Sequence, residues 1–235
     1  MTERKKVAVV AGAGPGNGAA LARRFAAAGY AVALLARSRE ALDRLESEIE
    51  GARGYACDVG AADQVAQAFA SIRAELGQVD ALLYNAGSGT FGDVESITPD
   101  QFEAAWRVNA LGSLLCARQV IPDMKAAGHG VILFVGATAS RRGGPRSAAF
   151  APAKAAQRSL AESMARSLWP SGIHVCLIVI DGVVDLPGTR QAMPDKPDSF
   201  FVRPDGVAEI AWQLTCQDPS AWSFEVEARP FGESW

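Results

Sequence analysis

The regular alternation of two kinds of segment along the 235-residue chain most constrains its fold. Short runs rich in Val, Ile, Leu and Ala have the length of β-strands, and between them lie alanine-rich segments, such as residues 18–29 and 38–50, with helical periodicity. Apolar strands separated by helices are typical of a parallel sheet that is covered on both faces. The pattern therefore predicts an α/β fold, a doubly wound parallel sheet of about seven strands with helices on both faces. The predicted strands are residues 6–12, 31–37, 52–59, 80–87, 130–136, 173–180 and 221–230.

The chain length suits one α/β domain, and no linker, repeat or low-complexity segment divides it. We therefore predict a single domain over residues 1–235. The longest stretch without a helix or strand pattern is residues 181–204, which is rich in Pro, Gly and Asp. Because loops of this length in compact domains usually serve as lids or binding loops, residues 186–203 are the predicted substrate loop.

Composition and charge exclude several classes of function. The net charge is −3 with dispersed Lys and Arg, so we expect no surface for nucleic acid or an anionic membrane. No apolar run approaches the roughly 18 residues of a membrane span. The cysteines are far apart and the histidines stand alone, which favours free thiols in a reduced, cytoplasmic compartment and gives no support to a metal site. These residues are Cys57, Cys116, Cys176, Cys216, His129 and His174.

A glycine-rich turn, AGAGPGNG, follows the first predicted strand. Its spacing is GxxxGxG through Gly12, Gly16 and Gly18, with a further glycine at Gly14. GxGxxG would need a glycine at Asn17, and the Gly-Lys-Ser/Thr ending of a P-loop is missing. A tight turn that exposes backbone N–H groups at a helix start can hold a pyrophosphate. The turn therefore predicts a Rossmann-like dinucleotide-binding domain; the alternative is a glycine-rich turn that binds nothing.

The end of the second predicted strand, LLARSRE, bears on which coenzyme is bound. A carboxylate there would bind the ribose diol of NAD, and it would repel a 2′-phosphate. The chain has Ala36 at that position and then Arg37, whose guanidinium can hold a phosphate with two hydrogen bonds. Ser38 and Arg39 can add contacts. We predict that NADP(H) is preferred over NAD(H), the alternative being that Arg37 is only a solvated charge at a helix start.

Five short motifs occur in order along the chain: GAGPGNG, CDV, YNAG, VNALG and FxxxK. With them the chain resembles the short-chain dehydrogenase/reductase (SDR) family over nearly its whole length. The resemblance implies hydride transfer between a nicotinamide coenzyme and a substrate carbon. It assigns Asp58 to the adenine, Asn85 to the nucleotide wall, and Asn109 and Lys154 to the active site. The residues predicted to bind the coenzyme are Gly12, Gly14, Gly16, Asn17, Gly18, Arg37, Ser38, Asp58, Val59, Asn85, Ala86, Gly87, Lys154, Gly182 and Val184.

The chain departs from the family pattern where the chemistry takes place. The family has a Tyr four residues before the Lys and a Ser thirteen residues before that Tyr, and here those positions hold Phe150 and Ala137. After the sixth strand Leu186 stands where the family has a Thr, although Val184 keeps a backbone position that can hold the nicotinamide amide. A positioned general acid is worth roughly 10²–10⁴ in rate. We therefore expect the usual route of carbonyl reduction to be severely impaired.

Other polar groups nearby are candidates to replace the missing ones. Ser140 or Ser147 can supply a hydroxyl, whereas strand alternation turns Thr138 the other way. Lys154, a water and Asn109 can form a slow proton relay, unless Asn109 only fills a hydrogen-bonding position in its helix. Three arginines in the following loop either bind a substrate carboxylate or phosphate or form a solvated surface. They are Arg141, Arg142 and Arg146.

The leading hypothesis is an atypical SDR-family oxidoreductase that binds NADP(H) and acts on a small ketone or alcohol, with Asn109 and Lys154 as the retained catalytic pair. The alternative is a catalytically silent NADP(H)-binding protein, either a sensor or the inactive partner in an oligomer, and a structural protein without a nucleotide is the third hypothesis. No motif identifies the substrate. The resemblance also implies a homodimer through helices near residues 101–125 and 149–169, or a homotetramer with a second interface at Trp222 and the C-terminal tail.

Overall fold

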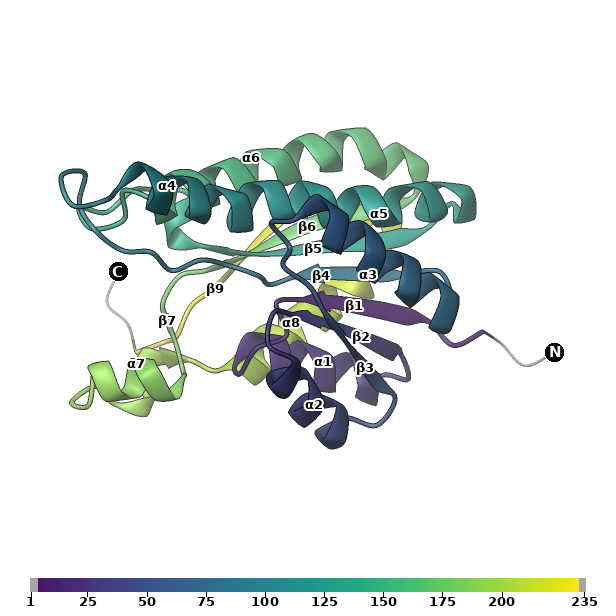
Figure 1. The fold of residues 1–235 in the computed structure, drawn as a ribbon, viewed down its shortest axis with the longest axis horizontal. Coiled ribbons are helices and arrows are strands. Elements are labelled where there is room, and N and C mark those ends of the chain that lie inside the picture. The colour runs from purple at the N-terminus through teal and green to yellow at the C-terminus, as the bar shows by residue number, and fades with distance from the viewer. Residues whose placement is uncertain (1–3, 233–235) are drawn as a thin grey trace.

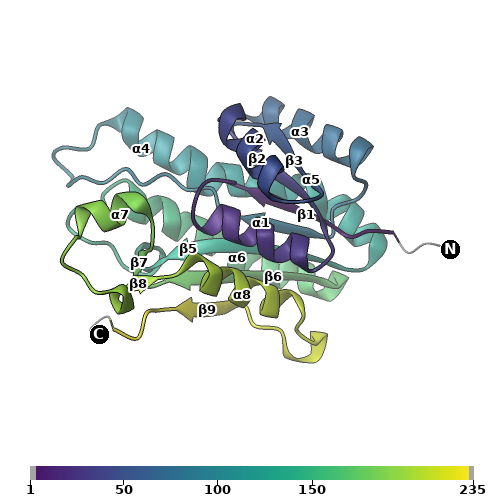
Figure 2. The same ribbon diagram turned by 90° about the horizontal axis from the view of Figure 1, so that it is seen from below.

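The computed structural model, which describes residues 4–232, contains one sheet of seven parallel strands with helices on both of its faces (Figure 1, Figure 2). The strand order is β3-β2-β1-β4-β5-β6-β9. All seven predicted strand segments contribute a strand to this sheet, and the predicted fold class is confirmed. The strands are β1 Val7–Ala11, β2 Ala31–Ala36, β3 Ala52–Ala56, β4 Ala81–Tyr84, β5 Gly130–Ala137, β6 Ile173–Ile180 and β9 Glu225–Ala228.

Two apolar layers, one on each face, hold the sheet between the helices. Val7 and Val9 of β1 belong to the layer under α3, α5 and α6, while Ala8 and Val10 belong to the layer under α1, α2 and α8. Since successive side chains of a strand point to opposite faces, a strand buried on both faces reads as a continuous apolar run. The main helices are α1 Asn17–Ala27, α2 Arg39–Glu48, α3 Ala62–Glu75, α4 Pro99–Trp106, α5 Gly112–Ala127, α6 Phe150–Leu168 and α8 Pro204–Thr215.

The strand order reverses between β1 and β4, at the centre of the sheet. From β1 the chain winds toward β3 at one edge, and from β4 it winds toward β9 at the other (Figure 1). In doubly wound sheets a ligand binds at such a switch point, outside the carboxyl ends of the strands. The glycine turn leaves β1 there, and the YNAG segment leaves β4 beside it.

The helix predicted over residues 101–125 is interrupted. A π-helical turn at Arg107–Leu111 separates α4 from α5, and it contains Asn109. The apolar pattern continues across this turn, so no sequence pattern indicates it. Single π-helical turns are frequent at functional sites because they redirect the side chains that they carry.

The stretch 181–204 contains short elements where the sequence pattern showed none. Arg190 links its two ends through ion pairs with Asp185 (2.7 Å) and Asp198 (2.6 Å). The guanidinium also lies over the Phe201 ring, 4.1 Å from its centroid. These local contacts give the segment a defined path, and its role as a substrate loop stays a prediction. The elements are β7 Val183–Val184, α7 Pro187–Ala192 and β8 Phe201–Val202, with β7 paired to β8.

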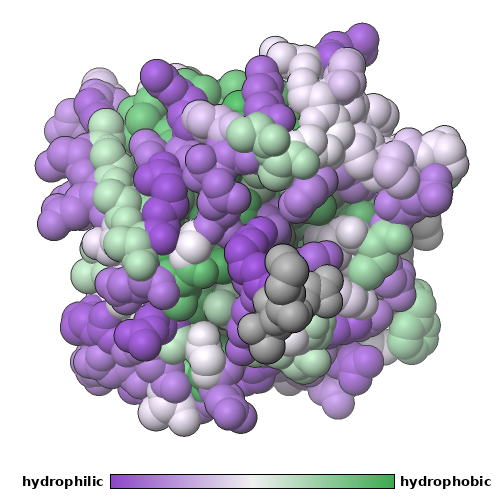
Figure 3. Space-filling model, turned by 90° about the vertical axis from the view of Figure 1, so that its right-hand side faces the viewer, coloured by the Kyte–Doolittle hydropathy of each residue, from purple (hydrophilic) through white to green (hydrophobic). Residues whose placement is uncertain are grey.

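The surface agrees with the ordinary composition of the chain. The face seen in Figure 3 is mostly hydrophilic, with apolar side chains in small groups. Across residues 4–232 no helix is long and apolar enough to span a membrane, and no cluster of three or more His, Cys, Asp or Glu could hold a metal ion. Trp222 stacks on His174 with 4.8 Å between the ring centroids, and Trp235 lies outside the described residues.

Candidate active site

The glycine turn after β1 fits closely against the start of the loop after β4. Gly12 has a φ of +90°, and a Cβ on it would lie 2.5 Å from the Cα of Ala86. A Cβ on Gly18 would lie 2.3 Å from the Gly12 carbonyl oxygen, so neither position can carry a side chain. A Cβ on Gly14, in contrast, would meet no atom within 4 Å. The turn is therefore packed against the protein at two glycines and open to a ligand at Gly14.

Helix α1 starts at this turn without a side-chain cap. Gly16, in the N-cap position with a φ of +91°, offers no side-chain acceptor to the N–H groups of the first turn. Uncapped helix starts attract phosphate groups, because their N–H groups and the helix dipole both favour negative charge. The Asn17 side-chain oxygen Oδ1 is buried there and has no hydrogen-bond partner within residues 4–232. The free N–H groups fit the diphosphate of a dinucleotide, and the Asn17 oxygen fits a hydrogen-bond donor of the same ligand or of a water.

Leu186 packs directly on the same turn. An ideal Cβ on Gly16 would lie 2.2 Å from Cδ2 of Leu186, so hydrocarbon covers this part of the backbone. Thr189 fixes the segment, because its hydroxyl donates to the Val184 carbonyl oxygen (2.6 Å) and accepts from the Leu186 N–H (3.0 Å). Gly182 lies between β6 and β7, just before Val184. The position where the family resemblance implies a hydroxyl therefore presents an apolar side chain to the glycine turn.

The arginines after β2 differ in their partners. Arg39 is committed to the protein, since it pairs with Asp43 (2.6 Å) and with Glu46. Ser38 caps α2 with its hydroxyl. Arg37 is exposed and makes no hydrogen bond or ion pair with the part of the chain that is described. Of the contacts predicted for a 2′-phosphate, Arg37 is the one whose guanidinium is still available.

Two polar side chains shape the walls of the site. Asn85 donates from Nδ2 to the Gly12 carbonyl oxygen (2.8 Å), which ties the end of β4 to the glycine turn. Asp58 accepts the Gly60 N–H (2.9 Å) with one carboxylate oxygen, and the neighbouring Val59 is buried. The bracing contact of Asn85 thus exists without a ligand, whereas the contact of Asp58 with adenine stays a prediction.

Lys154 is buried, with a side chain that points back into the protein. Its Nζ donates to the Val135 carbonyl oxygen (2.9 Å) and to Oε1 of Gln157 (3.0 Å). Burial lowers the pKa of Lys154 to about 7, because a charge away from water is disfavoured. The sequence reasoning missed Gln157; its spacing of i+3 from Lys154 on one helix was the available signal.

The side chains of Asn109 and Lys154 both come close to the position that a Cβ of Gly87 would take. The Asn109 side chain donates from Nδ2 to the Ala105 carbonyl oxygen (2.9 Å), so it does fill a hydrogen-bonding position in its helix. Its Oδ1 is nevertheless buried without a partner in the described residues. From the ideal Cβ position of Gly87, this oxygen is 3.3 Å away and Nζ of Lys154 is 3.6 Å away. The structure therefore brings the two predicted active-site residues together, with an unused acceptor on Asn109.

Phe150 occupies the start of α6 and belongs to an aromatic pair. Its ring centroid is 5.3 Å from that of Phe91, which is 62% exposed. Nζ of Lys154 lies 6.0 Å from the Phe150 ring centroid. The loop that carries Phe91 is fastened by the Gly92 N–H, which donates to the Arg146 carbonyl oxygen (2.9 Å). Phe150 and Phe91 thus place an aromatic pair next to Lys154, and neither ring carries a hydroxyl.

The hydroxyl groups near Ala137 all have partners inside the protein. Ser140 donates to the Ala137 carbonyl oxygen (2.6 Å), and Ser147 donates to the Gly144 carbonyl oxygen (2.9 Å). Thr138 turns to the far side of the strand end and bonds to Asp181. None of the three proton donors is free to face Lys154 in this arrangement.

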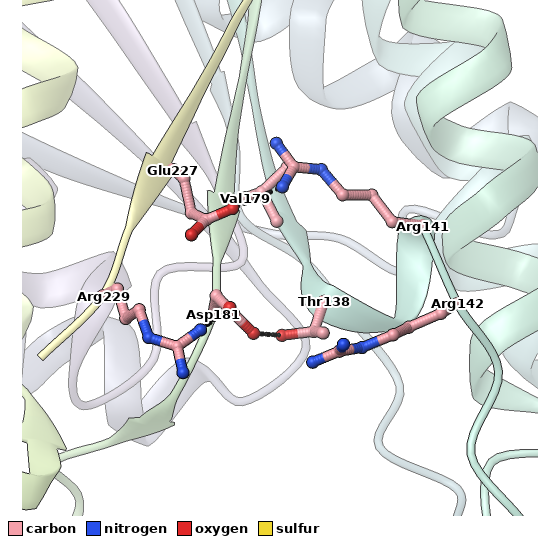
Figure 4. Close-up of a pocket in the computed structure, with 7 residues that line it drawn as sticks. All are labelled: Thr138, Arg141, Arg142, Val179, Asp181, Glu227 and Arg229. Atoms are coloured by element: carbon pink, nitrogen blue, oxygen red, sulfur yellow. Dashed lines mark hydrogen bonds and ion pairs between the residues drawn. The ribbon is translucent and has the colours of Figure 1, made fainter. Parts of the chain in front are cut away.

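A cluster of ion pairs, which we call the β6–β9 cluster, lies on that far side around a cavity of about 220 Å³ (Figure 4). Asp181 bonds to Thr138 and Arg229, while Arg141 pairs with Glu225 (2.8 Å) and Glu227. Figure 4 shows Arg142 extending toward Thr138 from the other wall. Arg141 is therefore engaged in ion pairs within the protein and is poorly placed to bind a substrate carboxylate.

A doubly wound parallel sheet with an open glycine turn and an uncapped helix start at its switch point defines a dinucleotide-binding α/β protein. The family described as short chain dehydrogenase matches residues 6–196, and the chain belongs to this family. It is 34% identical to 2-(R)-hydroxypropyl-CoM dehydrogenase of Xanthobacter autotrophicus over 210 residues, which cover 84% of this chain and 83% of the relative.

Two further relatives bear on the coenzyme. The structure of a metagenomic short-chain oxidoreductase in complex with NADP has a TM-score of 0.84 and 30% identity, covering 97% of this chain and 98% of that one. The 2-dehydro-3-deoxy-L-rhamnonate dehydrogenase (NAD(+)) of a Sphingomonas species is 32% identical over 169 residues, covering 72% of this chain and 68% of the relative. Both coenzymes thus occur among the relatives, and family membership alone does not choose between them.

Proposed function

We propose that the chain is an oxidoreductase that binds NADP(H) and interconverts a small ketone and the corresponding alcohol, with Lys154 and Asn109 handling the proton. The observation that carries the proposal is the pair formed by Nζ of Lys154 and Oδ1 of Asn109 beside Gly87. Burying an amine and leaving an amide oxygen unpaired both cost free energy. Both costs are explained if a ligand or a water forms hydrogen bonds with the Lys154 amine and the Asn109 amide oxygen.

NADP(H), when bound, supplies a hydride to the substrate carbon or accepts one from it. The chain's own residues hold it: the start of α1 and Gly14 for the diphosphate, and Arg37 for the 2′-phosphate. The NADP bound to one relative supports the choice of coenzyme. Because another relative is NAD(+)-dependent by name, the proposed preference rests on Ala36 and Arg37 of this chain and not on family membership.

Proton transfer is assigned to Lys154, with a water held against Asn109. An ammonium has three N–H donors, and two of those on Lys154 are used by Val135 and Gln157. The third donor and Oδ1 of Asn109 can hold one water between them. With its pKa near 7, Lys154 can give or take a proton at neutral pH, as a general acid or base must.

The aromatic pair favours a substrate that is apolar next to its carbonyl group. Phe91 and Phe150 form an aromatic pair where the usual SDR pattern has a phenol, and Phe91 is an exposed residue. An apolar or aromatic substituent gains contact area there, and it loses no hydrogen bond.

The catalytically silent binding protein is the second candidate. It is favoured by the internal bonding of Ser140, Ser147 and Thr138, which leaves none of these three hydroxyls for a substrate oxygen. In that case the coenzyme binds with the same preference, and turnover is absent.

Two measurements separate these candidates. Titration of the protein with NADPH and NADH, followed by tryptophan fluorescence, tests coenzyme binding, which both candidates require. Oxidation of NADPH with a panel of aryl and alkyl ketones is then followed for the wild type, Lys154→Met and Asn109→Ala. Slow turnover that both variants abolish supports the oxidoreductase, whereas coenzyme binding without any turnover supports the silent protein. Binding of neither coenzyme would refute both.

Assembly and location complete the proposal. We propose a homodimer or homotetramer, supported by the exposed Phe102 (43%) and Trp106 (42%) on α4, which a second copy would cover. Sedimentation velocity measures the state directly, and a monomer at high concentration would contradict it. A cytoplasmic location remains a prediction from the cysteine pattern.

A further inference from the structure

A chain of hydrogen bonds runs behind Lys154, between α6 and α5. Gln157 accepts from Nζ of Lys154 (3.0 Å) and donates from Nε2 to Oγ of Ser113 (3.0 Å). Ser113 in turn donates to the Asn109 carbonyl oxygen (2.7 Å). Gln157, Ser113 and Asn109 are each fully buried. A buried glutamine whose amide oxygen and nitrogen both have partners is specified by its surroundings, because an unsatisfied amide would cost free energy.

The direction of these hydrogen bonds fixes the orientation of the Gln157 amide. The Ser113 hydroxyl spends its one proton on Asn109, so its oxygen must accept from the next group. Gln157 therefore points its NH₂ group at Ser113 and its carbonyl oxygen at Lys154. In the reverse orientation two donors would face each other at Lys154. Ser113 thus orients Gln157, and Gln157 holds the amine.

The surroundings of the amine contain no charged partner. The groups that face Nζ are the Val135 carbonyl from β5, Asn109 from the π-helical turn, Gly87 from the loop after β4, and Phe150 and Gln157 from α6. None of them titrates. Burial is the only cause that lowers the pKa of Lys154, and no charge in the described residues offsets it.

We propose that Gln157 is a positioning residue, which holds Nζ of Lys154 beside Asn109 and Gly87 on a neutral acceptor, so that the amine can release and regain a proton. A carboxylate at this place would hold the ammonium form, and a hydrocarbon would leave the amine without its second anchor. The role in turnover rests on the proposed function, but the effect on Lys154 is measurable without coenzyme.

The first test uses the pH dependence of unfolding by urea, without coenzyme. Lys154 is largely deprotonated in the folded protein above its pKa of about 7, whereas an unfolded lysine keeps its proton up to about 10.4. Between about pH 7 and 9 the unfolded state therefore holds one more proton than the folded state. As the pH rises through this range, the Lys154 contribution lowers the equilibrium constant for unfolding on the order of tenfold per pH unit. Comparison with Lys154→Met isolates this contribution, because the two proteins have the same buried thiols and the same other titrating groups.

Three variants decide the role of Gln157. Gln157→Glu keeps Lys154 protonated and should remove the pH dependence, as Lys154→Met does. Gln157→Met removes the acceptor and should extend the pH dependence below pH 7. Gln213→Glu, a matched change on the exposed face of α8, should behave as the wild type. A wild-type pH dependence in both Gln157 variants overturns the proposal, and so does a wild type that already matches Lys154→Met.

The second test measures NADPH affinity against pH for the same proteins. The positively charged form of Lys154 should favour the anionic coenzyme, so the wild-type affinity should weaken as the pH rises through about 7, and Gln157→Glu should flatten this profile. Profiles that are alike in the wild type and Gln157→Glu contradict the positioning role. If NADPH does not bind, the proposed function fails, while the unfolding test still decides the role of Gln157.

Discussion

The ends of β2 and β5 lie at the same edge of the sheet and use their polar side chains in opposite ways. After β2, Arg37 extends into solvent without a protein partner, while its neighbour Arg39 is held by two carboxylates. After β5, Thr138 and Ser140 both bond inward to the protein. The end of β2, where a guanidinium has no protein partner, is suited to bind a charged ligand. The end of β5, where the hydroxyls bond to the protein, is suited to keep a fixed conformation. The proposed coenzyme half of the site, at the end of β2 and the glycine turn, therefore resembles a working binding site more closely than the proposed catalytic half at the end of β5 does.

Adding the two hydroxyls that the family resemblance implies at positions 137 and 150 should have the largest effect on this contrast. The double variant Ala137→Ser with Phe150→Tyr should raise ketone-dependent NADPH oxidation by roughly 10²–10⁴, because a positioned acid and an oxyanion donor each stabilise the transition state. The measurement is the initial rate against a panel of ketones.

Phe91→Tyr serves as the matched control for the double variant, because it adds a phenol to the exposed partner of the same aromatic pair. An unchanged rate in the double variant, with the coenzyme still bound, would show that adding these two hydroxyls is not sufficient for ketone reduction at this site.

Removing one carboxylate from the β6–β9 cluster should show how firmly the catalytic end is held. Asp181 and Arg229 are each 13% exposed at their side chains, so Asp181→Ala takes an ion-pair partner from a nearly buried arginine. We expect the free energy of unfolding to fall by about 2 kcal/mol, since a hydrogen bond to a charged group contributes about 1.5–3 kcal/mol. Glu227→Ala, at an exposed pair whose Arg141 keeps Glu225, should cost less than about 1 kcal/mol. Equal losses in urea denaturation would mean that the cluster does not support this end.

The sequence could predict the coenzyme half better than the catalytic half, and the reason is physical. Gly12 and Gly18 are required because a side chain would collide with backbone at 2.5 Å and 2.3 Å, and such requirements leave a spacing that can be read. The strands are equally readable, because burial on both faces demands unbroken apolar runs. Contacts such as Lys154 with Val135, or Arg141 with Glu225, join residues that only the fold brings together. No local pattern records them.

The next largest effect is expected at the end of β2. Arg37→Ala should weaken NADPH binding by roughly 10–100-fold, since a hydrogen bond to a charged group is worth about 1.5–3 kcal/mol. NADH binding should change little, because the 2′-phosphate is the difference between the coenzymes. Arg39→Ala removes a guanidinium that is already paired, so it should leave the ratio of the two affinities near that of the wild type. A ratio that is the same in Arg37→Ala and the wild type would remove the basis for the coenzyme preference.

The smallest expected effect lies at Leu186, where the two halves of the site meet. Leu186 covers Gly16 with hydrocarbon, and Thr189 already bonds to its backbone N–H, so shortening this side chain leaves the segment anchored. Leu186→Thr uncovers the turn and adds a hydroxyl, and it should raise NADPH affinity by about threefold, within the roughly 1 kcal/mol of a single neutral hydrogen bond. Leu186→Val uncovers the turn to a similar extent and adds no hydroxyl. A gain with Thr alone assigns the effect to the hydrogen bond, and an equal gain with both assigns it to removal of the apolar cover. A loss of affinity in both variants would show instead that Leu186 packs on the coenzyme and belongs to the binding half of the molecule.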